Sequence, residues 1–443
     1  IIRMLEQYLG EEVFRKGLIY YLNKFKYGNA TTDDLWSSLE KISKKPVKKI
    51  MHVWTNQTGF PIVSVSLKNN KIKLEQKRFF YLKRKNKQIW YLPILISKKY
   101  YLMRKRKEYI KNLKDISINK YQVGFYRVNY DNKLLNKLLN SKLSILEKIG
   151  LHNDIYALTR GSYIPLKFYL RLAYTYRNET NHAMWDDLST SLGRIHLLFY
   201  DKYKDEINKF TIRLFSNIFK KLGWEEKPKD KHTDIILRAN VIGALGFSGH
   251  KEIIKEAERR FKDYLKSKKI NPNLRAAVYD LTAFNGDKKI FNKLKELYLK
   301  EKLQEEKIRL LLALGAFKQK DLLKKALEFS LSKHVRSQDT MYLISIVGGN
   351  EYADDLAWEF LKKNWKEFYK RYKEGHVLPN LIKAVTLRFK TLDKSKDIEE
   401  FFKKHEAPNA KRAIQQVSEA IKINYNMVKY NEAKLKGWLN EFA

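Results

Sequence analysis

Histidine is the residue type best suited to bind a catalytic metal in this chain, because cysteine is absent. The nine histidines stand at positions 52, 152, 182, 196, 232, 250, 334, 376 and 405. No two of them have the four-residue spacing that places both imidazoles of a His-Glu-x-x-His site on one helix face. The sequence also has no nucleophile elbow, phosphate-binding loop or dinucleotide-binding glycine pattern. We therefore expect surface or packed histidines, no metal site and no complete active site.

The second chemical feature is positive charge. The chain has 90 Lys and Arg against 49 Asp and Glu, a formal net charge of +41. Such a field attracts polyanions such as nucleic acid. The alternative is a composition bias, with lysines spread through the chain as in lysine-rich thermophile proteomes. Basic runs at 83–85, 104–107 and 266–269 adjoin expected turns. We expect a solvated basic surface, with a functional basic face as the alternative, since composition specifies no docking element.

The compartment is constrained by what the chain lacks. No apolar run approaches the roughly 20 residues that cross a bilayer, and the first residues do not have a signal-peptide pattern. The absence of cysteine fits a reducing compartment. We expect a cytoplasmic protein with no membrane partner. The sequence begins without Met inside a helical pattern, so we also expect a fragment or a processed product.

Helices are expected over the first 60 residues. Apolar residues at 1, 4, 5, 8 and 9 follow the spacing of one helix face, and Gly10 stands at a C-cap position. A second apolar stripe runs from 14 to 25. Thr31 and Asp34 have the spacing of a capping box, which predicts the start of a third helix.

The hydrophobic period changes to two near residue 60. Val63, Val65 and Leu67 alternate with serines, which is typical of a strand. Asn69-Asn70 is a hairpin signal, and Pro93 favours an edge position for the strand at 90–96. With a further strand at 123–130, these patterns predict a small β-sandwich.

From residue 132 onward the pattern is helical and weakly repetitive. Segments beginning at Gly249, Gly286 and Gln319 resemble one another, with equivalent positions 37 and 32 residues apart at Ile253, Ile290 and Leu322. A period of this length suits stacked helical hairpins of the HEAT or armadillo kind. The predicted fold class is mainly α with a small all-β domain.

A series of short motifs resembles the M1 family of zinc aminopeptidases (gluzincins). They include Gln76-Lys77-Arg78-Phe79 and the segments 2–6, 9–14, 27–36, 54–61, 124–131, 335–340 and 356–360. Their order and spacing cover nearly the whole chain, which makes the set specific although each motif is modest. The nearest relatives appear, on this resemblance, among archaeal tricorn-interacting-factor aminopeptidases.

The resemblance implies three parts. Residues 1–60 would be the helical tail of a thermolysin-like catalytic domain, 61–131 the β-sandwich, and 132–443 an α-solenoid bowl over the active site. The family's zinc motif, exopeptidase loop and catalytic tyrosine would precede Ile1, so zinc belongs to the parent enzyme and this part is expected to be inactive alone. The implied partners are peptide substrates, the protein's own N-terminal catalytic domain and a protease assembly.

The resemblance also suggests three substrate-binding candidates. Lys383 matches a position that faces the substrate pocket in the family and meets acidic side chains in some members. Arg336 and Gln338, with Asp339, lie in a matching segment, where hydrogen bonding at a helix terminus is the alternative role. For Lys383 the alternative is a solvated surface lysine.

Two other functional classes compete with the peptidase interpretation. One is a basic α-solenoid module that binds nucleic acid or acidic proteins, and the other is an interaction scaffold in a protease assembly. The ordered motif series favours part of a peptidase, which makes nucleic acid an unexpected partner.

Overall fold

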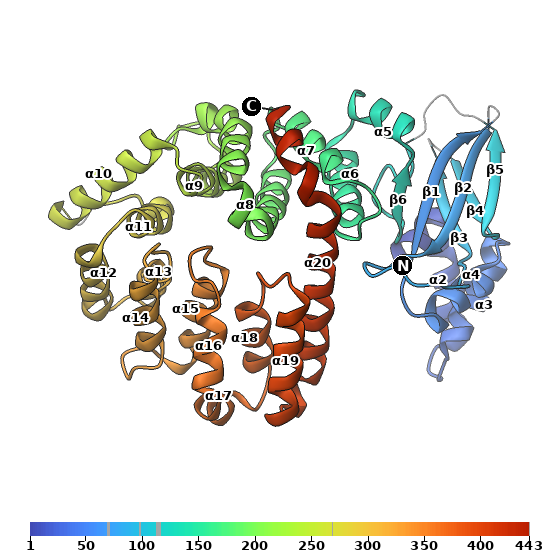
Figure 1. Ribbon diagram of the computed structural model, residues 1–443. Coiled ribbons are helices and arrows are strands. Elements are labelled where there is room, and N and C mark those ends of the chain that lie inside the picture. Colours follow the sequence, from blue (N-terminus) through green and yellow to red (C-terminus); the bar gives the residue numbers. More distant parts are fainter. Residues whose placement is uncertain (69–70, 97–98, 112–116, 268, 443) are drawn as a thin grey trace. The chain divides into compact units, whose positions relative to one another are not determined.

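The computed structural model describes residues 1–68, 71–96, 99–111, 117–267 and 269–442 (Figure 1). Their contacts divide the chain into two compact units, Ile1–Ile164 and Pro165–Ala443. The fold is mainly α-helical with small β-sheets, as the sequence predicts. The boundaries expected after residues 60 and 131 fall where helices change to strands and strands change to helices. Contacts join residues 1–164 in one unit, so both stay predictions as domain boundaries.

The first unit begins with helices whose ends follow from local sequence. They are α1 (Ile2–Leu9), α2 (Glu11–Phe25), α3 (Thr32–Ser43) and α4 (Val47–Asn56). Gly10 separates α1 from α2 with φ of 97°, a value that side chains disfavour. The predicted capping box is confirmed, since the Thr31 side chain accepts from Asp34 N and the Asp34 carboxylate accepts from Thr31 N at 2.9 Å.

The strands of the first unit form two sheets. They are β1 (Pro61–Lys68), β2 (Lys71–Arg78), β3 (Leu92–Ile96), β4 (Lys99–Met103), β5 (Lys107–Lys111) and β6 (Arg127–Tyr130). One sheet has the order β5-β2-β1-β6, with β6 parallel to β1, and the other pairs β3 with β4. Pro93 thus lies in an edge strand, as predicted. The predicted Asn69-Asn70 turn lies outside the described residues, and the sandwich packing of the sheets stays a prediction.

A buried glutamine on β2 connects this sheet to the segment that leads into β3. Gln76 is 0% exposed. Its amide nitrogen donates to Trp90 O at 2.9 Å and to Lys105 O at 3.1 Å, and its amide oxygen accepts from Trp90 N at 2.8 Å. Every polar atom of the side chain is therefore used, which gives a physical reason for the glutamine in the Gln76-Lys77-Arg78-Phe79 motif.

Two helices complete the first unit, α5 (Asn132–Leu139) and α6 (Ile145–Arg160). Asp154 on α6 accepts from Val128 N at 3.0 Å and pairs with Arg127 at 3.4 Å. Burial raises the pKa of Asp154 to about 7, while Arg127 acts to lower it. This contact fixes α6 to β6.

The second unit consists of helices. Its α-helices are α7 (Leu166–Thr175), α8 (His182–Leu222), α9 (His232–Phe247), α10 (Lys251–Ser267), α11 (Arg275–Phe284), α12 (Lys288–Lys300), α13 (Gln304–Ala313), α14 (Lys320–Ser330), α15 (Ser337–Gly349), α16 (Leu356–Lys363), α17 (Trp365–Tyr372), α18 (Val377–Val385), α19 (Leu392–Lys404) and α20 (Lys411–Asn440). Short 3₁₀ helices at Pro272–Leu274 and Pro408–Ala410 precede α11 and α20.

These helices alternate between an inner and an outer series. The inner helices α8, α9, α11, α13, α15, α18 and α20 pack each against the next, and α20 also packs against α8 (Figure 1). The outer helices α10, α12 and α14 pack against inner neighbours. The three similar segments recognised in the sequence contain the first turns of these same outer helices. The repeat therefore corresponds to one inner and one outer helix.

The two longest helices bring the ends of this unit together. α8 has 41 residues, with non-helical backbone angles at Tyr203, and α20 has 30 residues. Asn431 on α20 accepts from Leu166 N at 2.8 Å, so it caps the first turn of α7. Within the described residues, neither these helices nor any shorter one combines the length and apolar character that a membrane crossing requires.

We predict that Gln76→Leu destabilises the protein by about 3 kcal/mol, because the buried backbone groups of Trp90 then lack hydrogen-bond partners. Urea denaturation followed by circular dichroism measures the effect. Gln7→Leu, at an exposed position on α1, is the matched control. Equal denaturation midpoints for the two variants would contradict the prediction.

Candidate functional site

The second unit contains a cavity of about 720 Å³. Its walls come from α8, α9, α11 and α15 and from the residues that follow α13. On α9, α11 and α15 the lining residues include those at the C-terminal end of the helix, such as Ser248, Phe284 and Asn350. The volume lies in the usual range for small-molecule and cofactor sites. We therefore take this cavity as the candidate functional site.

Small residues allow the inner helices to approach one another beside the cavity. A Cβ atom at Gly246 would lie 2.4 Å from Leu281, and one at Gly315 would lie 2.8 Å from Ile346. At Gly348 it would lie 2.8 Å from the Ala384 carbonyl oxygen. These contacts leave no room for a side chain. Gly and Ala recur among the lining residues as well, so the sequence signal for the cavity is a recurrence of small residues about 33 to 40 positions apart.

Two carboxylates of the cavity have different surroundings. Glu351, after α15, pairs with His196 on α8, and both side chains are largely buried. Asp280 on α11 is half-buried and has no hydrogen-bond or ion-pair partner among the residues that the structure describes. Burial alone raises the pKa of Asp280 to about 7. No sequence pattern singles out this residue, because its lack of a partner depends on which side chains the other described helices place around it.

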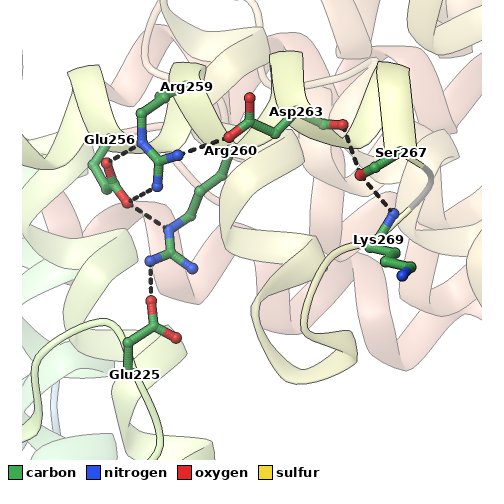
Figure 2. A network of polar contacts seen from close by, with 7 residues as sticks. All are labelled: Glu225, Glu256, Arg259, Arg260, Asp263, Ser267 and Lys269. Carbon is green, nitrogen blue, oxygen red and sulfur yellow. Dashed lines mark hydrogen bonds and ion pairs between the residues drawn. The ribbon is translucent and has the colours of Figure 1, made fainter.

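Acidic residues on the outer helix α10, unlike Asp280, have arginine partners. On α10, Arg259 binds both Glu256, at 2.7 and 2.8 Å, and Asp263, at 2.7 Å (Figure 2). Arg260 donates to Glu256 at 2.8 Å and also pairs with Glu225. Ion pairs with an exposed partner such as these contribute little to stability. They make α10 a helix of mixed charge and not a basic face.

The three substrate-binding candidates do not meet in this cavity. Arg336 and Gln338 lie at the N-terminal end of α15, whereas the cavity adjoins its C-terminal part. Lys383 is exposed on α18, while its neighbours Leu381 and Val385 are buried. The structure therefore brings none of the three to the cavity wall.

Arg336 takes part in a local network at the start of α15. Its Nε donates to Asp339 Oδ2 at 2.8 Å, and Gln304 donates to the same oxygen at 2.8 Å. Asp339 is 1% exposed, while the Arg336 side chain is 49% exposed. These contacts fit the helix-terminus role for Arg336. Gln338 is exposed and has no side-chain hydrogen bond within the described part of the chain.

A zinc site needs three protein ligands or more. Within residues 1–68, 71–96, 99–111, 117–267 and 269–442, no three His, Cys, Asp or Glu side chains are grouped so that they can hold a metal ion. The described residues therefore form no site for the zinc ion, which the family resemblance assigns to the preceding part of the parent enzyme.

Fold and cavity together define a helical domain with a ligand-sized cavity. Residues 116–423 match the family model of the ERAP1-like C-terminal domain, and residues 1–54 match that of the peptidase family M1 domain. The chain belongs to the ERAP1-like C-terminal domain family. Its first 54 residues make it part of a family M1 protein as well, as the motif series predicts.

Plant and yeast aminopeptidases are among its relatives. The chain is 32% identical to Aminopeptidase M1 of Arabidopsis thaliana, over 97% of this chain and 53% of that protein. It is 31% identical to Aminopeptidase M1-A of Oryza sativa subsp. japonica, over 100% of this chain and 54% of the relative. It is 30% identical to the mitochondrial Aminopeptidase 2 of Saccharomyces cerevisiae, over 91% of this chain and 44% of that protein. The chain thus spans about half the length of the curated relatives it matches.

We predict that Asp280→Asn stabilises the protein more at pH 8 than at pH 5. In the unfolded chain this carboxyl loses its proton near pH 3.9, whereas in the folded protein it keeps the proton until about pH 7. The folded state therefore binds more protons between these values, and stability falls as pH rises through them. Asparagine does not ionise, so the variant does not show this fall in stability with rising pH.

Thermal denaturation at the two pH values measures this effect. We expect the variant to gain several degrees in Tm over the parent chain at pH 8, because a pKa raised from about 3.9 to about 7 corresponds to at most about 4 kcal/mol and each kcal/mol shifts the Tm of a large domain by about 2–4 °C. The gain at pH 5 is smaller. A Tm difference that is the same at both pH values would show that Asp280 titrates normally.

Proposed function

We propose that this chain is the C-terminal part of a zinc-dependent aminopeptidase that removes N-terminal residues from peptides. The observation that carries the proposal is the double family match, to a peptidase M1 domain over residues 1–54 and to the ERAP1-like C-terminal domain over residues 116–423. The zinc ligands and the catalytic tyrosine then belong to a segment that precedes Ile1.

The role of this part is to shape substrate access. The helical unit is a solenoid bowl, the sheets form a β-sandwich, and the cavity accepts residues of the peptide beyond the cleaved bond. The size of the cavity supports this role, because 720 Å³ is more than a single side chain fills. The partners are peptides, the protein's own catalytic domain and a protease assembly of the tricorn-interacting type. Archaeal relatedness and a cytoplasmic location belong to the same proposal.

The first test compares the chain alone with the chain joined to its preceding segment. We expect the longer protein to cleave an aminoacyl reporter and to lose this activity when a zinc chelator is added. The chain alone should neither cleave the reporter nor bind zinc tightly, because its described residues contain no group of three His, Cys, Asp or Glu side chains that could hold a metal ion. Chelator-sensitive turnover by the chain alone, or an inactive longer protein that folds and binds zinc, would contradict the proposal.

Lys383 gives a second prediction about the longer protein. An exposed lysine on α18 offers a mobile positive charge to acidic substrates. Lys383→Ala should reduce kcat/KM about fivefold for peptides with an acidic residue near the N-terminus, corresponding to about 1 kcal/mol. Neutral peptides should be affected less. Lys396→Ala, at a side chain that is 72% exposed, is the control. Equal effects on both peptide classes would leave Lys383 as surface charge only.

A further inference from the structure

One face of the larger sheet in the first unit carries an array of lysines. Along β2 the buried side chains of Ile72, Leu74 and Gln76 alternate with more exposed ones. Successive side chains of a strand point to opposite faces, so the more exposed set shares one face, which we call the basic face. The strand register adds the residues opposite them on β1 and β5, which lie on either side of β2 (Figure 1). The polar members of the basic face are Ser64, Ser66 and Lys68 on β1, Lys71, Lys73, Glu75 and Lys77 on β2, and Lys107, Tyr109 and Lys111 on β5.

The positive charge of the basic face is poorly compensated. Its members include six lysines and one carboxylate. Glu75 pairs with Lys73 at 3.0 Å and with Lys107 at 3.7 Å. The other four lysines of the face form no ion pair with any residue that the structure describes. The face therefore attracts a ligand with several negative charges.

Three of these lysines form a row across three strands. Lys71 stands directly opposite Lys68 on one side and Lys111 on the other. Like charges that stand directly opposite each other destabilise a sheet, so the stability of the fold gives no reason for this row. Lysines on an edge strand can prevent edge-to-edge pairing. That role explains lysines on β5, which is an edge strand, but not those on β1 and β2, which have a neighbour on both sides.

The spacing of the lysines suits a chain of phosphate groups. Residues two apart on one strand are separated by about 7 Å, and neighbouring strands are about 5 Å apart. Ammonium groups on flexible stems can therefore reach several negative groups of an extended polymer that lies on the sheet. A row of this kind fixes the path of the polymer but does not by itself identify the polymer.

An exposed tyrosine lies among the lysines. Tyr109 stands between Lys107 and Lys111 on β5 and directly opposite Lys73 on β2. It is 52% exposed, and its ring packs against no other aromatic ring of the described residues. Nucleic-acid bases stack on aromatic side chains of this kind, and the neighbouring cations hold the backbone. Tyr109 thus favours nucleic acid over a polyanion without bases.

The positive charge continues beyond the Lys77 end of the face. The ammonium groups of Lys77 and Lys83 lie 5.3 and 5.2 Å from the centre of the Tyr163 ring. Lys83 also donates to Ser162 O at 2.8 Å. Lys83 belongs to the basic run 83–85 of the sequence. This run therefore adds charge next to the basic face.

We propose that the basic face binds single-stranded nucleic acid, with its lysines on the phosphates and Tyr109 as a stacking surface for a base. The hydroxyls of Ser64 and Ser66 offer donors between the lysines. A sheet surface suits a single strand, whose base faces are accessible, whereas a duplex keeps these faces inside its stack. Basic composition alone specifies no docking element, and this sheet supplies one. The proposal does not rest on the proposed peptidase function.

Binding of a fluorescein-labelled oligothymidylate to the 443-residue chain tests the proposal. An oligomer of about 12 nucleotides lies within the range that one small β domain covers, and fluorescence anisotropy measures its affinity. With four or five phosphates in contact, we expect log K to fall with log salt with a slope of about −3, a loss of about 50-fold between 50 and 200 mM salt. A blunt duplex of the same length should bind at least fivefold more weakly. A duplex that binds as tightly as the single strand would overturn the proposal.

Two triple variants with the same loss of charge locate the binding. Lys68→Gln, Lys71→Gln and Lys111→Gln together should weaken the oligothymidylate at least tenfold and make the salt slope shallower by about 2. Lys300→Gln, Lys396→Gln and Lys436→Gln, at side chains that are 74%, 72% and 64% exposed in the second unit, should weaken it less than twofold. Equal losses in the two variants, both folded by circular dichroism, would show binding to the basic surface as a whole and overturn the assignment to the face.

Tyr109 distinguishes nucleic acid from other polyanions. Tyr109→Leu should weaken the oligothymidylate at least fivefold, and Tyr109→Phe, which keeps the ring, should bind as the parent chain does. Equal affinities of the leucine and phenylalanine variants would refute stacking and overturn the proposal. So would polyglutamate that binds as tightly as the oligothymidylate. Tighter binding to vesicles of phosphatidylcholine and phosphatidylserine, lost in the variant that lacks Lys68, Lys71 and Lys111, would reassign the face to a membrane surface.

Discussion

Short helices leave their last carbonyl groups without partners inside the helix, and the second unit depends on how these groups are satisfied. In the later part of this unit, a side chain from the following segment reaches the end of the preceding inner helix. Asn350 donates to Gly315 O and Phe317 O, both at 2.9 Å. Arg388 donates to Asn350 O at 2.7 Å, and Asn424 to Phe389 O at 2.9 Å. These bonds fix the offset between successive repeats, because a shifted repeat would leave buried carbonyls unpaired.

The same constraint places the cavity. The inner helices end close together because Gly348 lies against the Ala384 backbone and Gly315 against the Ile346 side chain, where a larger residue would not fit. Their C-terminal ends then surround one space, and the packing of α20 against α8 closes the series. Several carbonyl groups at these ends accept hydrogen bonds from Asn350 and Arg388, so the charge of the cavity lining depends mainly on its side chains. The side chains adjust it, through Asp280, which is left unpaired, and Glu351, which is paired with His196.

Local patterns predicted much of the fold, and long-range pairing explains what they missed. The capping box at Thr31, the strand around Val63 and the starts of α10, α12 and α14 depend on residues that are close in sequence. The cavity depends on contacts such as that between His196 and Glu351, which are 155 positions apart. The hydrophobic periodicity of a sequence gives no information on such a contact. The family resemblance drew attention to Arg336, Gln338 and Lys383, but the structure places these residues away from the cavity wall.

Net charge and site charge act over different distances in this protein. At physiological salt, exposed charges are screened within about 8 Å, so the basic surface governs approach, whereas the cavity governs what is held inside it. The formal net charge of +41 is thus a property of the surface as a whole, whereas the cavity lining contains Asp186, Asp280 and Glu351 and no Lys or Arg. The two have to be considered separately, because screening by salt weakens the interactions of exposed charges much more than those of partly buried groups.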